Sequence, residues 1–329
     1  MKVDVHWHHV PRGFVEAVFS GSLEVEGKPD TTGPVPAIDV KRGKVRITDA
    51  MSELEPALEA LETSGMDYAT PSLVPPLSHY DAPSEVAVAV ARSVNDGFAK
   101  MAEDSRGRLR PLAHVPLQDP PAAVAELKRA TSELGLAGVA IGTNVDGRNL
   151  GDEFMRPFWR TVAEEDLFVF IHPENPIGVE RLHLFDLRNF VGFPIDTAVA
   201  AASMIFAGVY EEVGPLKTVY AHGGGAFPYL FGRWMHGYDH RVANDSPLSK
   251  NPAEYLSSLY CDSLLHSGNS LRFLTELVGT DHVLLGGDYP FNMGDSHPYD
   301  SMAAAISSES DRELVGGLTA ARLLGIEGS

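Results

Sequence analysis

The chain has 329 residues, 44% of them hydrophobic, so it can bury a large core as one α/β domain or as two smaller ones. We interpret residues 1–329 as a single domain. The 45 acidic and 26 basic residues give a net charge of −19, and a field of that sign repels phosphate backbones and anionic lipid surfaces. Nucleic acid and membranes are therefore not expected partners, and an anionic small molecule would have to be held by individually placed arginines.

The cysteine content and the N-terminal segment bear on the cellular location of the protein. Cys261 is the single cysteine, which excludes an internal disulfide and fits a reducing environment. Residues 1–11 lack the charged and apolar pattern of a signal peptide, and no run approaches 18 consecutive apolar residues. The sequence therefore predicts a cytoplasmic protein.

Short apolar, β-branched runs alternate along the chain with segments of helical periodicity. This pattern is typical of a parallel sheet whose strands are joined by crossover helices. Eight runs are predicted strands, at 3–8, 66–74, 109–117, 136–143, 167–172, 216–222, 259–265 and 282–288. Eight strand–helix pairs predict a closed (β/α)8 barrel, the TIM-barrel fold.

Apolar stripes between these runs predict the covering helices. The first stripe runs from Met51 to Leu61 with spacings of three and four, and it ends at Gly65. Residues 14–47 are rich in glycine, proline and charge, and they are too many for an ordinary loop. We expect a small β-rich insertion there, over the barrel mouth, and two further helices at the C-terminal end, the last over 312–324.

Polar residues collect at the predicted carboxyl ends of the strands, where barrels of this kind carry their chemistry. Alternation along the first strand points His6 and His8 to the same side. The fifth strand ends at His172, the sixth at His222 and the eighth at Asp288. These five side chains are therefore predicted to converge on one rim.

Each of these residues taken alone has a simpler interpretation. A histidine at a strand end is usually a hydrogen-bonded rim residue, a glycine-rich run is usually a turn, and an aspartate before Tyr-Pro is often a cap. Their joint placement on strands one, five, six and eight is much harder to explain by accident. Six of the remaining histidines are scattered along the chain and are assigned no role: His114, His183, His236, His240, His266 and His297.

Several imidazoles with one carboxylate form a donor set suited to zinc, or to manganese or iron in a more open site. An open coordination position could hold a water whose pKa falls to about 7. The sequence thus predicts a metal-dependent enzyme with a divalent ion, most simply Zn²⁺.

These residues, in this order, resemble the amidohydrolase superfamily, and the detail resembles its 2-amino-3-carboxymuconate-6-semialdehyde decarboxylase-like family. The most specific segments are His-Gly-Gly-Gly-Ala-Phe-Pro from His222 and Asp-Tyr-Pro-Phe from Asp288, and the match extends along the whole chain. The resemblance implies that His6, His8, His172 and Asp288 bind the metal. It implies that His222, with Asp288, is catalytic and acts on the metal-bound water.

The resemblance also bears on metal number, substrate and assembly. Binuclear relatives need a bridging lysine or glutamate on strand four, which here ends Ala-Ile-Gly-Thr-Asn, so one metal is expected. The family pattern assigns substrate carboxylates to Arg46 and to Arg233 of a neighbouring subunit, which implies a homodimer. The chain departs from the family's tryptophans at Glu174 and Asn189, and it has Gly287 in place of a threonine, so the pocket wall has changed.

The leading hypothesis is a non-oxidative decarboxylase of a small unsaturated or aromatic carboxylic acid. Metal-dependent hydrolysis or hydration at the same site remains an alternative, since related members catalyse both. A third alternative is a metal-stabilised binding protein that has kept the barrel. Release of carbon dioxide from a panel of acids would distinguish the first hypothesis from the other two.

Overall fold

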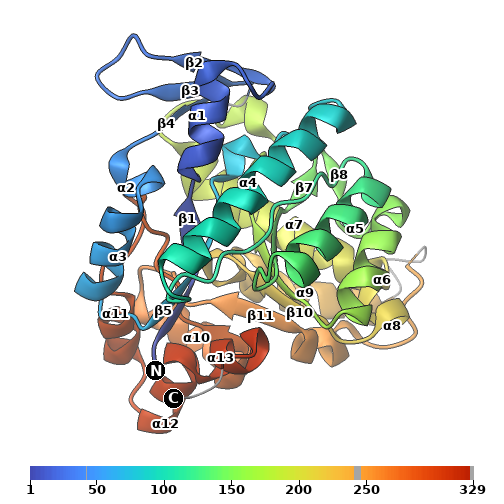
Figure 1. Ribbon diagram of the computed structural model, residues 1–329. Helices are drawn as coiled ribbons and strands as arrows, with labels where there is room; N and C mark the ends of the chain where they lie inside the picture. Colours follow the sequence, from blue (N-terminus) through green and yellow to red (C-terminus); the bar gives the residue numbers. More distant parts are fainter. Residues whose placement is uncertain (42, 241–245, 327–329) are drawn as a thin grey trace.

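The computed structural model describes residues 1–41, 43–240 and 246–326, and it shows a parallel barrel surrounded by helices (Figure 1). The regular wall strands are β1 Val3–His9, β5 Tyr68–Leu73, β6 Val139–Gly142, β9 Phe168–His172, β10 Lys217–Tyr220, β11 Leu259–Asp262 and β12 Val283–Leu284. β1 pairs with β5, and β6, β9, β10, β11 and β12 follow one another in that order, all in parallel.

The third predicted strand completes the wall without forming a regular ladder. Its first residue, Leu109, bridges to Ala69 of β5, and Ala113 bridges to Val139 of β6. Arg110 and Leu112 donate to β5 carbonyls, but Pro71 of β5 has no backbone N–H to donate in return. Pro111 likewise has none to donate toward β6, so the ladder is interrupted on both sides. The segment nevertheless occupies the position of the third barrel strand.

The barrel closes between its first and last strands. The backbone N–H of Val5 donates to the carbonyl of Leu285, at 2.9 Å, and a parallel bridge joins Trp7 to Tyr289. The predicted (β/α)8 fold is therefore confirmed, with an irregular third strand and an eighth strand whose regular part is short.

Helices cover the outside of the barrel, as the apolar stripes predicted. The longer ones are α3 Leu54–Thr63, α4 Ser84–Asp104, α5 Pro120–Lys128, α6 Arg156–Glu164, α7 Phe193–Phe206, α9 Phe227–Asp239, α10 Gly268–Val278 and α11 Pro298–Ala305. Shorter elements are α2 Asp49–Ser52, α8 Val209–Val213, α12 Glu309–Glu313 and the hairpin β7 Asn144–Val145 with β8 Arg148–Asn149. The 3-10 segments are η1 Pro75–Leu77, η3 Glu153–Met155, η4 Val179–Arg181, η6 His222–Gly224, η7 Pro252–Ser258 and η8 Thr280–His282. The π-helical segments are η2 Arg129–Glu133, η5 Arg188–Gly192 and η9 Leu314–Leu318.

Apolar side chains fill the barrel at the end where the strands begin. Val3, Phe168 and Leu284 belong to one buried cluster with Leu323 and Leu324 of the last helix, α13 Thr319–Leu324. The N-terminus and α13 lie together at this end in Figure 1. The polar site is thereby confined to the opposite end.

The segment after β1 begins as a helix, which the prediction of a β-rich insertion over 14–47 did not include. Phe14 and Val18 stand four residues apart and are both buried, so they form the apolar stripe of α1 Arg12–Ser20. The remainder is β-rich as expected, because β2 Gly27–Asp30, β3 Ala37–Val40 and β4 Gly43–Arg46 form an antiparallel sheet. Figure 1 shows this sheet above the end of the barrel toward which β1 runs.

One helical stretch, Arg188–Phe206, is long and apolar enough by length and composition to cross a membrane. It consists of η5 and α7. In the structure Ala198, Ala201 and Met204 are buried, as in a helix that packs on a protein core.

Candidate metal centre and active site

An irregularity in β1 directs two histidines into the barrel. The register of β1 against β5 shifts between Asp4 and Trp7, and such a shift re-aims the side chains that follow it. Val5 belongs to the interior cluster, yet the next residue, His6, also faces inward and contacts the ring of Phe170 at 5.0 Å between centroids. His6 and His8 are both fully buried.

Four predicted ligands come together at the strand ends. The candidate ligand atoms of His6, His8, His172 and Asp288 all lie within 4.8 Å of one another. Oδ1 of Asp288 is 3.3 Å from Nε2 of His6 and 3.2 Å from Nε2 of His8, and these two nitrogens are 3.2 Å apart. The strands thus bring together residues more than 280 positions apart in the sequence.

The outer nitrogens of the imidazoles have partners that favour Nε2 as the free ligand atom. Nδ1 of His6 is 2.7 Å from Oδ2 of Asp262, and Nδ1 of His172 is 2.8 Å from the carbonyl of Pro173. Both partners accept hydrogen bonds, so each imidazole keeps a proton on Nδ1, and Nε2 is the atom left to coordinate a metal ion. This is the tautomer that a metal ligand requires.

Asp262 is the functional residue that the sequence interpretation missed. It ends β11, is fully buried, and also accepts the backbone N–H groups of His222 at 2.9 Å and Gly223 at 2.8 Å. In the sequence, Asp262 is a single aspartate within the predicted strand 259–265. No polar residue is predicted at the end of that strand, so Asp262 does not stand out. One carboxylate therefore orients His6 and fixes the turn that carries His222.

The charges in this cluster are unevenly distributed. Burial would raise the pKa of Asp288, but the imidazoles of His6, His222 and His8 hold it well below its ordinary range. Burial lowers the pKa of His172 well below its usual value, and the neighbouring His8 and His222 act in the same direction. Asp288 is thus a carboxylate and His172 a neutral imidazole, the forms that bind metals.

The pKa of His6 is shifted in the opposite direction to that of His172. Burial lowers its pKa, but Asp288 and Asp262 outweigh burial and raise the pKa to about 10. A group that holds a proton this firmly between two carboxylates indicates a local excess of negative charge, which a divalent cation would neutralise in place of the proton.

The positions of these donor atoms fit a metal ion, and so does their chemistry. Nε2 of His6 and Nε2 of His8 lie 3.2 Å apart, so both could coordinate one ion. Oδ1 of Asp288 is buried without a hydrogen-bond partner among the described residues. A cation among these atoms would satisfy all of them.

His222 lies beside this group on a strained turn. It follows β10 with a φ of 56°, in the left-handed region that non-glycine residues rarely adopt, and Asp288 has a φ of 58°. Nε2 of His222 is 4.0 Å from Oδ2 of Asp288, and its side chain is 21% exposed. The imidazole therefore borders both the ligand cluster and the open space above it.

That space is a cavity of about 510 Å³, within the usual size range for small-molecule sites. His172, His222 and Asp288 line its floor, and Arg46 and Lys44 of β4 lie on its wall. The other lining side chains are largely apolar and include Met51, Val74, Pro75, Phe193, Pro290, Phe291 and Met293. Arg46 thus lines the same cavity as His172, His222 and Asp288, and its role in substrate binding stays a prediction.

Arg233 lies apart from this cavity in its own chain. It is exposed on α9, and it has no ion-pair partner in the part of the chain that the structure describes. Its predicted role in a neighbouring site concerns a second subunit and stays a prediction.

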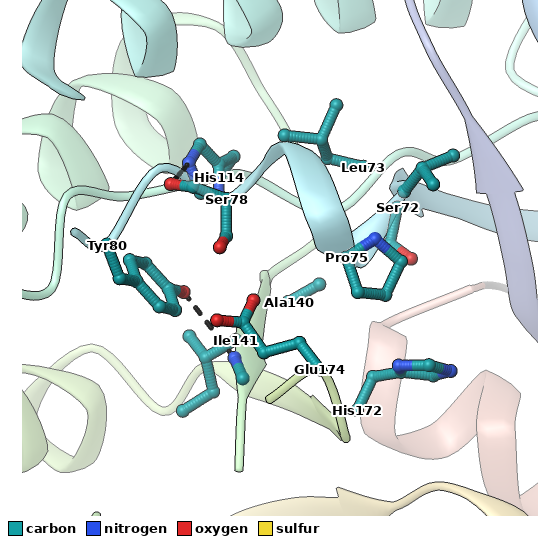
Figure 2. A pocket seen from close by; sticks show the side chains of 12 residues that line it. Ser72, Leu73, Pro75, Ser78, Tyr80, His114, Ala140, Ile141, His172 and Glu174 are labelled. Atoms are coloured by element: carbon teal, nitrogen blue, oxygen red, sulfur yellow. Dashed lines mark hydrogen bonds between the residues drawn. The ribbon is translucent and has the colours of Figure 1, made fainter. Parts of the chain in front are cut away.

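A second, small cavity adjoins the first. Val74, Pro75, His172 and Glu174 line both, and Figure 2 shows the smaller one with Tyr80 and His114 on its far side. Glu174 and Asn189, the two predicted departures in the pocket wall, both line the large cavity.

Comparison with known proteins agrees with this geometry. The amidohydrolase family model matches residues 3–326. The chain is 35% identical over 274 residues to 2-amino-3-carboxymuconate-6-semialdehyde decarboxylase of Dictyostelium discoideum, covering 82% of this chain and 76% of that protein. It is 28% identical over 317 residues to gamma-resorcylate decarboxylase of Rhizobium sp. strain MTP-10005, covering 91% and 94%.

Solved structures share the fold over nearly the whole chain. IDCase of Metarhizium anisopliae superposes with a TM-score of 0.86 at 24% identity, covering 100% of this chain and 98% of that one. A 2,6-dihydroxybenzoate decarboxylase in complex with 2,6-dihydroxybenzoate gives 0.80 at 25%, covering 99% of each chain. A dihydroxybenzoic acid decarboxylase from Polaromonas sp. JS666, with bound manganese and 2-nitroresorcinol, gives 0.77 at 22%, covering 100% and 98%.

The barrel and its His₃Asp cluster define a class of proteins, the metal-binding (β/α)8-barrel enzymes. Within that class the chain belongs to the amidohydrolase family, and it is a member of the 2-amino-3-carboxymuconate-6-semialdehyde decarboxylase-like branch. The resemblance predicted from its motifs is confirmed.

Proposed function

We propose that the protein is a metal-dependent, non-oxidative decarboxylase of a small aromatic or unsaturated carboxylic acid. The observation that carries the proposal is the His₃Asp cluster at the floor of a cavity with an arginine on its wall. The two curated relatives reported above are both decarboxylases, which favours carbon–carbon cleavage over hydrolysis or hydration.

One divalent ion would be held by His6, His8, His172 and Asp288. Zinc fits this donor set, and manganese, which a related decarboxylase structure contains, fits it too. When bound, such an ion acts as a Lewis acid that polarises a substrate oxygen.

Arg46 would position the substrate. It is exposed on β4 at the cavity wall and has no ion-pair partner among the described residues, whereas its neighbour Lys44 is paired with Asp30 at 2.7 Å. The guanidinium of Arg46 is thus free to make a two-pronged hydrogen bond to a carboxylate, while Lys44 adds positive potential. The apolar residues that line much of the cavity suit a flat, conjugated ring or chain.

His222 would supply the proton. In decarboxylation the carbon–carbon bond to the carboxylate breaks, carbon dioxide leaves, and the electron pair remains on the substrate carbon, delocalised into the conjugated system. A protonated His222 at the cavity floor can deliver a proton to that carbon and then recover one from solvent. Asp288, with its Oδ2 4.0 Å from Nε2 of His222, would stabilise the protonated imidazole.

The proposal is tested by supplying the metal-loaded protein with hydroxybenzoates, aminobenzoates and muconate-like acids and measuring carbon dioxide. Stoichiometric release with appearance of the decarboxylated product supports it. Addition of water to the same acids, or hydrolysis of lactones without carbon dioxide, would replace it with a hydratase or lactonase.

We further propose that the protein acts as a homodimer. Large apolar side chains are exposed in one stretch after β9 and on α9: Ile177, Leu184, Phe185, Phe190, Val191, Ile195 and Tyr229. Phe185 is 83% and Tyr229 86% exposed, and patches of this kind mark interfaces. Arg233 stands four residues after Tyr229 and so shares its face of α9, while Asp186 and Asn189 of the same stretch line the cavity. A second subunit on this patch would therefore approach the cavity mouth.

A cytoplasmic location is likewise a proposal. It is supported by the single, buried Cys261, because a chain that forms no internal disulfide suits a reducing compartment. Fractionation of cells with a compartment marker tests it.

A further inference from the structure

The small cavity beside the active site, here called the side pocket, shares part of its lining with the large cavity. Its volume is about 20 Å³, and it shares Val74, Pro75, His172 and Glu174 with the cavity that contains the ligand cluster. A volume of this size holds roughly one water-sized group. Whatever binds above the metal ligands can therefore extend into it by about one non-hydrogen atom.

The side pocket combines apolar walls with a few polar groups. Leu73, Val74, Pro75, Ala140 and Ile141 line it together with Ser72, Ser78, Tyr80, His114 and the carboxyl of Glu174. Glu174 separates the two spaces and is only 2% exposed. Figure 2 shows its carboxyl reaching toward Tyr80, whereas the imidazole of His172 points away. A buried carboxyl at a partition between two cavities is costly unless polar groups meet it.

The backbone around Glu174 fixes this arrangement. A Cβ atom on Gly142 would stand 3.2 Å from Cδ of Glu174 and 3.1 Å from Cε2 of Tyr80, so the absence of a side chain at this position lets both groups close over the strand. Nη2 of Arg188 donates to the carbonyl of Glu174 at 2.6 Å. Glu174 is therefore held in place by β6 and by the segment after β9.

The chemistry of a carboxyl determines what the side pocket can select. The two oxygens of a carboxylate can accept several hydrogen bonds at once, so a bound ligand can donate one beside those from the protein. A hydroxyl or amino group can donate to it and fits the volume. A methyl group fits but donates nothing, and a carboxylate neither fits nor donates.

We propose that Glu174 is a specificity-determining residue whose side pocket receives one hydroxyl or amino substituent of the substrate. The inference rests on the proposed function, because it takes the acid to bind above the ligand cluster. It narrows the substrate class to conjugated acids that carry a hydroxyl or amino group away from the carboxylate that is lost. That substituent donates its hydrogen to the Glu174 carboxyl.

The test compares 2-hydroxybenzoate with derivatives that carry one further hydroxyl, amino or methyl group at each ring position. Dissociation constants are measured by calorimetry on the metal-loaded protein, for the wild type, E174Q and E174L. E180Q and E180L are matched controls, since Glu180 lies in the same segment but lines neither cavity. Carbon dioxide release is measured separately.

We expect at least one hydroxyl or amino derivative to bind the wild type more tightly than the parent acid. E174L should reduce that advantage by about 10- to 100-fold and E174Q by less, because a glutamine keeps one acceptor oxygen. Within each variant, the dissociation constants of the parent and methyl acids should change by the same factor. A purely structural role of Glu174 would weaken every acid equally.

The inference is overturned if no polar derivative binds more tightly than the parent, or if E174Q and E174L both keep the full advantage. E174Q replaces one carboxyl oxygen with an amide nitrogen and should preserve the fold. Its dissociation constants therefore test the inference if E174L does not fold. Selective binding without carbon dioxide release would leave the side pocket supported and refute the proposed function, so the two failures are distinguishable.

Discussion

The carboxylate of Asp262 lies 2.7 Å from Nδ1 of His6, and these two buried residues come from strands seven and one of the barrel. The same carboxylate accepts the backbone N–H groups of His222 and Gly223. It therefore links the orientation of a proposed metal ligand to the position of the proposed catalytic acid, although Asp262 itself lies outside the ligand group.

Asp262→Asn should weaken metal binding about 10- to 100-fold, because the amide lowers the basicity of His6 and turns an N–H₂ group toward backbone donors. Competition with a chelator measures the change. Asp166→Asn is the control, since Asp166 is 79% exposed and pairs with Lys217. Equal metal affinity in Asp262→Asn and the wild type would show that this carboxylate does not tune the ligand.

Metal analysis should find about one divalent ion per chain, and His6→Ala or Asp288→Ala should remove most of it, because each change deletes one of the four ligands. Circular dichroism confirms that the variants fold. Two ions per chain, or full retention in both variants, would be incompatible with a mononuclear site. Reconstitution of the apoprotein with zinc or manganese then identifies which ion restores activity.

His222→Asn should keep its metal and lose roughly 10²- to 10⁴-fold in turnover, since the imidazole supplies the proton but is not among the four ligands. Asparagine tolerates the left-handed backbone at this position better than alanine, so the change isolates the imidazole. Loss of metal in proportion to activity would instead place His222 among the ligands.

The convergence of the rim residues could be predicted because each stands at the end of an apolar run, where the barrel topology alone determines its neighbours. Asp262 was missed because its importance depends on a contact with His6, which local sequence patterns do not report. The irregular third strand could not be predicted from its apolar pattern, since Pro71 and Pro111 interrupt the hydrogen bonds but not the burial. The helix α1 was missed because its stripe is only two buried residues long.

A pH dependence of stability follows from His114, which lies at the side pocket. Burial, with the neighbouring His79, lowers its pKa from 6.5 to about 3. In the unfolded chain His114 therefore takes up a proton near pH 6.5, whereas in the folded chain it does so only near pH 3. The contribution of His114 to stability is complete above pH 6.5 and is lost as the pH falls toward 3.

Between about pH 7 and pH 5 this loss amounts to roughly 2 kcal/mol. Urea unfolding at the two pH values measures it, and His114→Gln should remove that part of the difference, because glutamine does not titrate. Glutamine can still donate to the carbonyl of Ser78, which Nε2 of His114 contacts at 3.0 Å. Parallel pH profiles for the wild type and His114→Gln would contradict the buried, neutral imidazole.

The last prediction concerns the shared site of the proposed dimer. Arg233 is exposed on α9 beside the apolar patch and lines no part of its own cavity, so its proposed substrate contact requires a second subunit. In a two-fold interface each subunit donates to the other's site. His222→Asn and Arg233→Ala chains should therefore both be inactive as pure dimers.

Mixing the two variants should restore activity. A mixed dimer rebuilds one intact site, in the subunit that keeps His222 and borrows Arg233 from its partner. Random re-pairing makes about half of the dimers mixed, with one good site in two, so roughly a quarter of the wild-type activity should return. Mass measurement of differently tagged chains confirms that subunits have exchanged. If exchanged mixtures stay inactive, or if the protein remains monomeric at working concentration, Arg233 does not complete a neighbouring site, and Arg46 is left as the arginine that holds the substrate carboxylate.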